Sequence, residues 1–247
     1  MHRPWPYSRV VAHRGGGAVA PENTLEGIRK AAEMGFGGVE FDVMLSSDKI
    51  PVLIHDETLE RTTDGRGAVA DTRLAELENL DAGSWFGSKY RGARLPSFEQ
   101  AGKLCVELGL WANVEIKPAM GFERETAAAA AKLARSLWHD ASPAPLLSSF
   151  QRSSLEVARA TAPEIDRGYL TDRIEPGWDE AARALDCVSV HCNFRYLSEA
   201  RASEIRAAGY WLLCYTVNDP ETARRLFSWG VDAIFTDRLD LISPDFS

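Results

Sequence analysis

Acidic and apolar side chains alternate in two short segments of the chain. Glu40 and Asp42 lie within residues 38–43, and Glu115 lies within residues 111–116. Because successive side chains of a strand point to opposite faces, Glu40 and Asp42 share one face and the apolar residues beside them share the other. We expect the apolar faces to contact helices and the three carboxylates to converge. Buried carboxylates repel one another unless a cation neutralises them, and all-oxygen ligands favour Mg²⁺ or Ca²⁺.

Two cationic side chains belong to the same pattern. Arg14 comes shortly after the apolar segment 10–12, and Lys117 directly follows the segment that contains Glu115. An arginine presents a planar fork that suits phosphate, and a lysine presents a point charge. An ion-pair network between these cations and the carboxylates is the alternative interpretation, because structural networks also gather charged residues. Three inward carboxylates beside two cations favour the metal site.

Two histidines flank the predicted metal site. His13 follows the apolar segment 10–12, and His55 follows a later apolar run. A pair of histidines near a cation is suited to general acid and base catalysis at neutral pH. Cleavage of a phosphodiester needs such a pair together with positive charge on the phosphoryl oxygens. We therefore predict that His13 and His55 are catalytic and that Arg14 and Lys117 bind phosphate.

The elements that must position these residues are strands and helices in strict alternation. A helix separates each successive pair of predicted strands, and the first helix is expected to begin at Asn23 with Glu26 three residues on. Such alternation implies parallel pairing, and eight units close into a TIM (β/α)8 barrel whose chemistry lies at the carboxyl ends of the strands. A doubly wound open sheet is the alternative, but no Gly-x-Gly-x-x-Gly turn supports it. The predicted strands are 10–12, 38–43, 111–116, 146–148, 165–170, 187–190, 210–215 and 231–235.

One segment does not follow the alternation. Residues 44–94 lie between the second strand and its helix and include an apolar run at 52–54 and a weak helical pattern at 74–80. A connection this long in a compact domain is usually functional. We predict an insertion subdomain over the barrel mouth, within a single domain that spans residues 1–247.

Composition and charge narrow the class of function. The 247-residue chain is 45% hydrophobic and 26% charged, with a formal net charge of −8. These values are typical of a folded globular protein and argue against a nucleic-acid partner. The four cysteines form no Cys-x-x-Cys pair, no apolar run reaches about 18 residues, and the first residues lack a signal-peptide pattern. We therefore expect a cytoplasmic protein without a membrane partner.

The same residues resemble the motifs of a known family. Residues 11–15 (Val-Ala-His-Arg-Gly) and 21–24 (Pro-Glu-Asn-Thr) resemble the opening motif of the glycerophosphodiester phosphodiesterases. The match covers nearly the whole chain in the right order and is similar to the short cytosolic bacterial type. Residues similar to the later motifs are 39–43, 55–56, 114–117, 215–218 and 230–237.

The resemblance implies a fold, an activity and a set of site residues. The family fold is a TIM barrel with a small insertion after the second strand. The family activity is metal-dependent hydrolysis of soluble glycerophosphodiesters to sn-glycerol 3-phosphate and an alcohol. The implied acid–base pair is His13 and His55, and the implied phosphate-binding cations are Arg14 and Lys117. The implied ligands of one divalent ion, Mg²⁺ or Ca²⁺, are Glu40, Asp42 and Glu115.

His191 and Tyr215 are further candidates for substrate binding. His191 follows the sixth predicted strand and could contact a glycerol hydroxyl or fill the barrel mouth. Tyr215 ends the seventh strand and stands where many family members have tryptophan, and Arg238 stands where proline is common. The sequence is compatible with choline, ethanolamine or glycerol as the alcohol. It is equally compatible with attack by water or by the glycerol 2-hydroxyl, with either histidine as the base.

Two other functions fit a barrel of this kind. Related barrels act on phospholipids, but they are usually secreted and carry membrane-binding or disulfide-linked loops, which this sequence lacks. A barrel that only binds phospho-ligands would lack a catalytic residue or a metal ligand, whereas every expected position is filled here. We therefore predict an enzyme for a small-molecule glycerophosphodiester, with a homodimer as the expected assembly.

Overall fold

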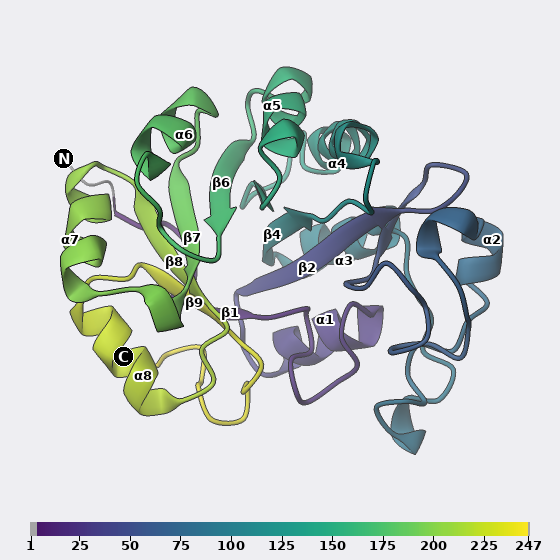
Figure 1. Cartoon of the computed structure of the whole chain (residues 1–247). Coiled ribbons are helices and arrows are strands. Elements are labelled where there is room, and N and C mark those ends of the chain that lie inside the picture. Colours follow the sequence, from purple (N-terminus) through teal and green to yellow (C-terminus); the bar gives the residue numbers. More distant parts are fainter. Residues whose placement is uncertain (1–3, 247) are drawn as a thin grey trace.

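Eight parallel strands close into a barrel with helices around its outside (Figure 1). The computed structural model describes residues 4–246, and within them the strand order is β1-β9-β8-β7-β6-β5-β4-β2-β3. Ala12 closes the ring because it pairs with Val39 on one side and with Thr236 on the other. The predicted TIM barrel is therefore confirmed. The strands are β1 (Val10–Ala12), β2 (Gly38–Leu45), β3 (Pro51–Leu53), β4 (Trp111–Ile116), β5 (Leu146–Ser149), β6 (Asp166–Thr171), β7 (Ser189–Asn193), β8 (Trp211–Tyr215) and β9 (Ala233–Thr236).

A helix follows each barrel strand except β9, and the insertion, which contains β3, lies between β2 and its helix α3. Among the described residues no helix is both long enough and apolar enough to cross a lipid bilayer. The helices are α1 (Leu25–Glu33), α2 (Leu74–Leu77), α3 (Phe98–Leu108), α4 (Glu123–Leu137), α5 (Arg152–Thr161), α6 (Trp178–Ala184), α7 (Glu199–Ala207) and α8 (Pro220–Ser228), with short 3-10 turns η1 (Val69–Asp71), η2 (Ser88–Tyr90) and η3 (Phe194–Tyr196).

The start of α1 differs from the prediction. The N-cap is Thr24, whose hydroxyl accepts a hydrogen bond from the Gly27 N–H, and Asn23 precedes the helix with a φ of 54°. Asparagine tolerates this left-handed conformation better than most residues. The Asn23 side chain is committed elsewhere, because its amide donates to Asp42 and its carbonyl accepts from the Asp42 N–H. The predicted cap at Asn23 is wrong by one residue, because the Asn23 side chain is hydrogen-bonded to Asp42 instead of to the start of the helix.

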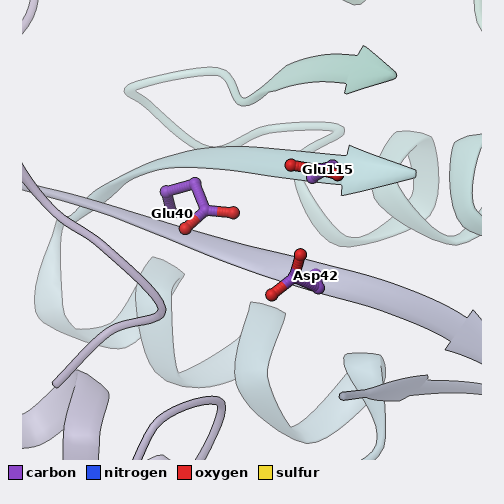
Figure 2. Close-up of side chains that lie close together, drawn as sticks. All are labelled: Glu40, Asp42 and Glu115. Atoms are coloured by element: carbon purple, nitrogen blue, oxygen red, sulfur yellow. The ribbon is translucent and has the colours of Figure 1, made fainter. Parts of the chain in front are cut away.

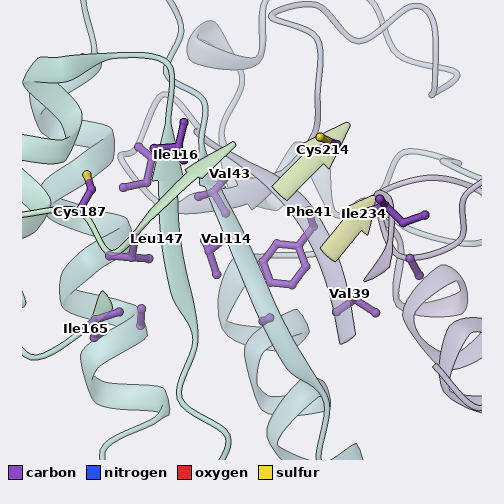
Figure 3. Packing of buried hydrophobic residues seen from close by; sticks show 14 of the residues in the cluster. Val39, Phe41, Val43, Val114, Ile116, Leu147, Ile165, Cys187, Cys214 and Ile234 are labelled. Carbon is purple, nitrogen blue, oxygen red and sulfur yellow. The ribbon is translucent and has the colours of Figure 1, made fainter. Parts of the chain in front are cut away.

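The apolar faces of the inner strands pack against the surrounding helices, as their alternation predicts. Val39, Phe41 and Val43 on β2 and Val114 and Ile116 on β4 are fully or almost fully buried in one hydrophobic core (Figure 3). Since neighbouring side chains of a strand point to opposite faces, this packing turns the acidic residues of both strands into the barrel.

The amino end of the barrel is closed by aromatic rings. Trp5 packs edge-on against Trp111 and Trp211, with ring centroids 5.3 Å and 5.2 Å away, and Tyr7 stacks on Trp111. Trp111 and Trp211 are the first residues of β4 and β8, so this cluster lies at the end of the barrel away from the strand carboxyl ends.

Trp5→Ala is expected to destabilise the fold without changing the mouth at the carboxyl ends of the strands, which lies at the opposite end of the barrel. Loss of a partly buried tryptophan should cost about 2–3 kcal/mol, which lowers Tm by roughly 5–10 °C in a chain of this size. Thermal unfolding followed by circular dichroism measures this change. An unchanged Tm would show that the aromatic closure contributes little.

The insertion after β2 has a small core of its own. β3 pairs antiparallel with the end of β2, so the apolar run that does not fit the alternation is a strand. The weak helical pattern at 74–80 forms only the single turn α2. Insertion residues Met44, Val52, Ile54, Leu59, Val69, Leu77 and Ala82 form a second buried cluster with Leu95 and Ala119.

Candidate active site

Three carboxylates meet inside the barrel (Figure 2). Glu40 and Asp42 come from β2 and Glu115 comes from β4, where Asp42 and Glu115 are register partners. One oxygen of each carboxylate lies within 4.8 Å of the others. Oε1 of Glu40 and Oε1 of Glu115 are buried and have no hydrogen-bond partner within residues 4–246. Buried oxygens without donors fit a hard divalent cation, which prefers carboxylate ligands.

The carboxylates do not ionise independently. Burial, followed by the charge of Asp42, raises the pKa of Glu40 to about 7. The same two causes raise the pKa of Glu115 well above its usual value. Burial also disfavours the charge of Asp42, but Arg14 and Lys117 outweigh it, so the pKa of Asp42 lies below its usual value. A bound cation would favour the ionised form of all three groups.

Arg14 and Lys117 lie on either side of Asp42. Nε of Arg14 is 3.6 Å from Oδ2 of Asp42, and Nζ of Lys117 is 3.7 Å from Oδ1. Arg14 also donates to Glu22 at 2.8 Å, and its backbone N–H donates to Oε2 of Glu40 at 2.9 Å. The ion pairs of the alternative interpretation are thus present, and Nζ of Lys117 also lies 3.8 Å from Oε1 of Glu115. Within residues 4–246, however, neither this oxygen nor Oε1 of Glu40 accepts a hydrogen bond.

His13 is held by the residue that directly follows the last strand of the barrel. Its Nδ1 lies 2.6 Å from Oδ1 of Asp237, and its Nε2 lies 3.8 Å from Oε2 of Glu40. Asn218 donates to the other oxygen of Asp237 at 2.8 Å. Burial lowers the pKa of His13, but the hydrogen bond to Asp237 and the charge of Glu40 outweigh it, so the pKa lies above its usual value.

His55 is held in the same manner by a different aspartate. Its Nδ1 lies 2.6 Å from Oδ1 of Asp56, which Arg61 contacts in turn, and its Nε2 lies 2.6 Å from Nζ of Lys117. Burial lowers the pKa of His55 below its usual value against the opposing charge of Asp42. An aspartate on Nδ1 fixes the tautomer of each ring, which directs Nε2 of His13 toward Glu40 and Nε2 of His55 toward Lys117.

Three residues that hold the histidines lie in the quoted motifs, although the sequence alone assigns them no role: Asp237, Asp56 and Asn218. Asp56 directly follows His55 in the sequence, and this adjacency is the signal that could have indicated its contact with His55. Asp237 follows β9 at a strand carboxyl end, where a barrel places its chemistry. Its pairing with His13, 224 residues away in sequence, depends on closure of the ring.

The two histidines, the two cations and the three carboxylates line one cavity of about 440 Å³. His191 lies within β7 rather than after its end, and it is fully buried. Its Nε2 is 2.9 Å from Oγ of Ser189, and burial lowers its pKa to about 3. Tyr215 donates its hydroxyl to the Thr171 carbonyl at 3.0 Å. Both side chains reach the cavity, and their contact with substrate stays a prediction.

A (β/α)8 barrel that gathers three carboxylates, two oriented histidines and two cations at one mouth has the groups that phosphodiester hydrolysis needs. The chain belongs to the glycerophosphoryl diester phosphodiesterase family, whose sequence model matches residues 13–241. It is a phosphodiesterase.

Relatives and solved structures agree with this placement. The chain is 34% identical to a glycerophosphodiester phosphodiesterase of Caldanaerobacter subterraneus over 234 residues, which is 92% of this chain and 93% of the relative. It is similar to an Oleispira antarctica phosphodiesterase solved with the product sn-glycerol 3-phosphate, with a TM-score of 0.88, 41% identity, and coverage of 94% and 93% of the two chains. The Thermotoga maritima glycerophosphodiester phosphodiesterase matches with a TM-score of 0.75 and 26% identity over 98% of each chain.

Proposed function

We propose that this enzyme hydrolyses glycerophosphodiesters to sn-glycerol 3-phosphate and an alcohol with one bound Mg²⁺ or Ca²⁺ ion. Glu40, Asp42 and Glu115 would hold the ion. The observation that carries the proposal is that both histidines line the cavity of the carboxylate cluster, where Nε2 of His13 lies near Glu40 and Nε2 of His55 contacts Lys117. The product bound to the Oleispira phosphodiesterase supports the same substrate class.

The chain's own residues supply the phosphate contacts and the proton transfers. When bound, the cation supplies positive charge that stabilises the phosphoryl oxygens in the transition state. The Arg14 fork and the Lys117 ammonium contact the same oxygens. Lys117 can reach them because its Nζ already lies between His55 and Asp42.

The two histidines divide the proton transfers between them. One ring accepts the proton of the attacking hydroxyl at Nε2, and the other donates a proton from Nε2 to the departing alkoxide. Asp237 and Asp56 keep each Nδ1 protonated and each ring in place. The attacking oxygen belongs to water or to the glycerol 2-hydroxyl, and the second route passes through a cyclic phosphate.

Product identity tests the proposal. Glycerophosphocholine incubated with the enzyme should give sn-glycerol 3-phosphate and choline, which ³¹P NMR distinguishes from phosphocholine and from a cyclic phosphate. Accumulation of a cyclic phosphate in a slow variant such as His55→Ala would support attack by the 2-hydroxyl. Direct ¹⁸O incorporation in a single inverting step would exclude that route.

A further inference from the structure

The cavity has two walls of different chemistry. The proposed catalytic groups lie on β2 and β4, directly after β1 and β4, or in the insertion after β2, and these three strands are neighbours in the ring. β7 lies across the ring from β2 in the strand order β1-β2-β4-β5-β6-β7-β8-β9. The wall on that far side carries Phe194, Arg195 and Tyr215. Phe150, which follows β5, adds its ring against Tyr215, with centroids 6.0 Å apart.

Arg195 is the cation of the far wall. It lies in η3, directly after β7, and lines the cavity although its side chain is exposed. Across residues 4–246 its guanidinium makes no hydrogen bond or ion pair, and its closest ring contact is Phe194, at 5.8 Å from the centroid. The neighbouring Arg173 does not line the cavity and instead lies over Tyr196, at 4.0 Å. Arg195 therefore has its donors available to a ligand.

The charges around Arg195 do not suit a cationic ligand. In the described chain the carboxylates that line the cavity are the three proposed metal ligands, Glu40, Asp42 and Glu115, and the far wall adds none. Asp172, the acid beside this wall, does not line the cavity and accepts a hydrogen bond from Asn193 at 2.9 Å. A quaternary ammonium on the far side would meet aromatic faces but also the positive charge of Arg195, and none of the described residues that line this wall is a carboxylate that could offset that charge.

A diester with its phosphate at the carboxylate cluster must place its two substituents in different directions. The floor of the cavity is built from buried residues, among them His191, Ser148 and Asn113, and we assign the small glycerol group to it. The larger and more variable alcohol then extends along the open far wall, between Phe150 and Phe194 and toward Arg195.

We infer that Arg195 selects glycerophosphodiesters whose alcohol carries a second anionic group, in particular a phosphate monoester. This inference rests on the proposed function of the cavity. The guanidinium fork can bind a phosphate through two parallel hydrogen bonds. Arg195 is thus a specificity-determining residue on the alcohol side, separate from the Arg14 and Lys117 pair that contacts the reacting phosphate.

The test compares kcat/KM for glycerophosphoinositol, glycerophosphoinositol 4-phosphate and glycerophosphocholine in the wild type and in Arg195→Gln. We expect the wild type to prefer the phosphorylated inositol substrate, and Arg195→Gln to reduce its kcat/KM relative to glycerophosphocholine by about tenfold, mainly through KM. The preference should weaken at high salt, because the site is open to solvent. Arg173→Gln is the matched control, since it removes the same charge from the same rim outside the cavity.

Each outcome separates the two proposals. If the wild type releases sn-glycerol 3-phosphate but does not prefer the phosphorylated substrate, the role of Arg195 is refuted and the proposed function stands. Equal losses on all three substrates in Arg195→Gln, or the same shift in Arg173→Gln, would also refute that role. No release from any of the three substrates by the wild type would overturn the proposed function itself.

Discussion

Replacing His13 or His55 by alanine is expected to lower kcat/KM for glycerophosphocholine by about 10³-fold in each case, the middle of the range for general acid or base catalysis. The two losses should differ when the leaving group changes. In a p-nitrophenyl ester of glycerol 3-phosphate, the leaving group is p-nitrophenolate, which departs without help from an acid. The variant that lacks the general acid should therefore recover to within about tenfold of the wild type on this ester, while the variant that lacks the base should not.

Release of p-nitrophenol measures this difference directly and assigns the two roles. His139→Ala is the control, because His139 is exposed and distant in sequence from the site motifs. Full activity in either catalytic variant, or equal rescue of both, would contradict an acid–base pair made of His13 and His55.

Glu40→Gln is expected to abolish metal-dependent activity and to stabilise the metal-free protein. The amide can still accept the hydrogen bond from the Arg14 N–H, but it cannot take the negative charge that burial and Asp42 disfavour at this position. Wild-type protein in metal at about 100 times Kd should gain about 2.7 kcal/mol, or roughly 5–10 °C in Tm. The variant should lose most of this gain.

The stabilisation of metal-free Glu40→Gln should depend on pH. The folded-state pKa of Glu40, about 7, lies above its usual value of 4.5, so the folded protein holds a proton that the unfolded chain has released. The contribution of Glu40 to the stability of the metal-free wild type therefore falls as pH rises from 4.5 through 7, and the advantage of the variant should be larger at pH 8 than at pH 5.

Thermal unfolding with EDTA, at both pH values, measures this effect. The exposed Glu107 provides a matched control, Glu107→Gln, which should show no change in metal response. A variant that is less stable than the wild type at pH 8 without metal would contradict the account of repelling carboxylates.

The barrel and the inward carboxylates follow from local sequence pattern. The alternation of acidic and apolar residues around Glu40, Asp42 and Glu115 fixes which face each side chain occupies, because a strand has a period of two. Their convergence follows once neighbouring strands are in register, and Asp42 opposite Glu115 confirms it.

Features that depend on distant contacts could not be derived in this way. The aspartate partner of His13 lies at the other end of the chain, and only ring closure brings them together. Asn23 has the residue type of a helix cap, but its contact with Asp42 determines its conformation. The far wall of the cavity depends on where a short turn places Arg195, and no periodic pattern encodes that position.

Release of sn-glycerol 3-phosphate from glycerophosphocholine, assayed with Mg²⁺ or Ca²⁺ and again with EDTA, tests the central claim most directly. We predict release in the presence of one of these ions, loss of release in EDTA, and recovery when the ion is restored. The same assay should show no restored activity in Glu40→Gln. Full release in EDTA from metal-stripped protein, or no release with either ion from a folded sample, would contradict a metal-dependent glycerophosphodiesterase.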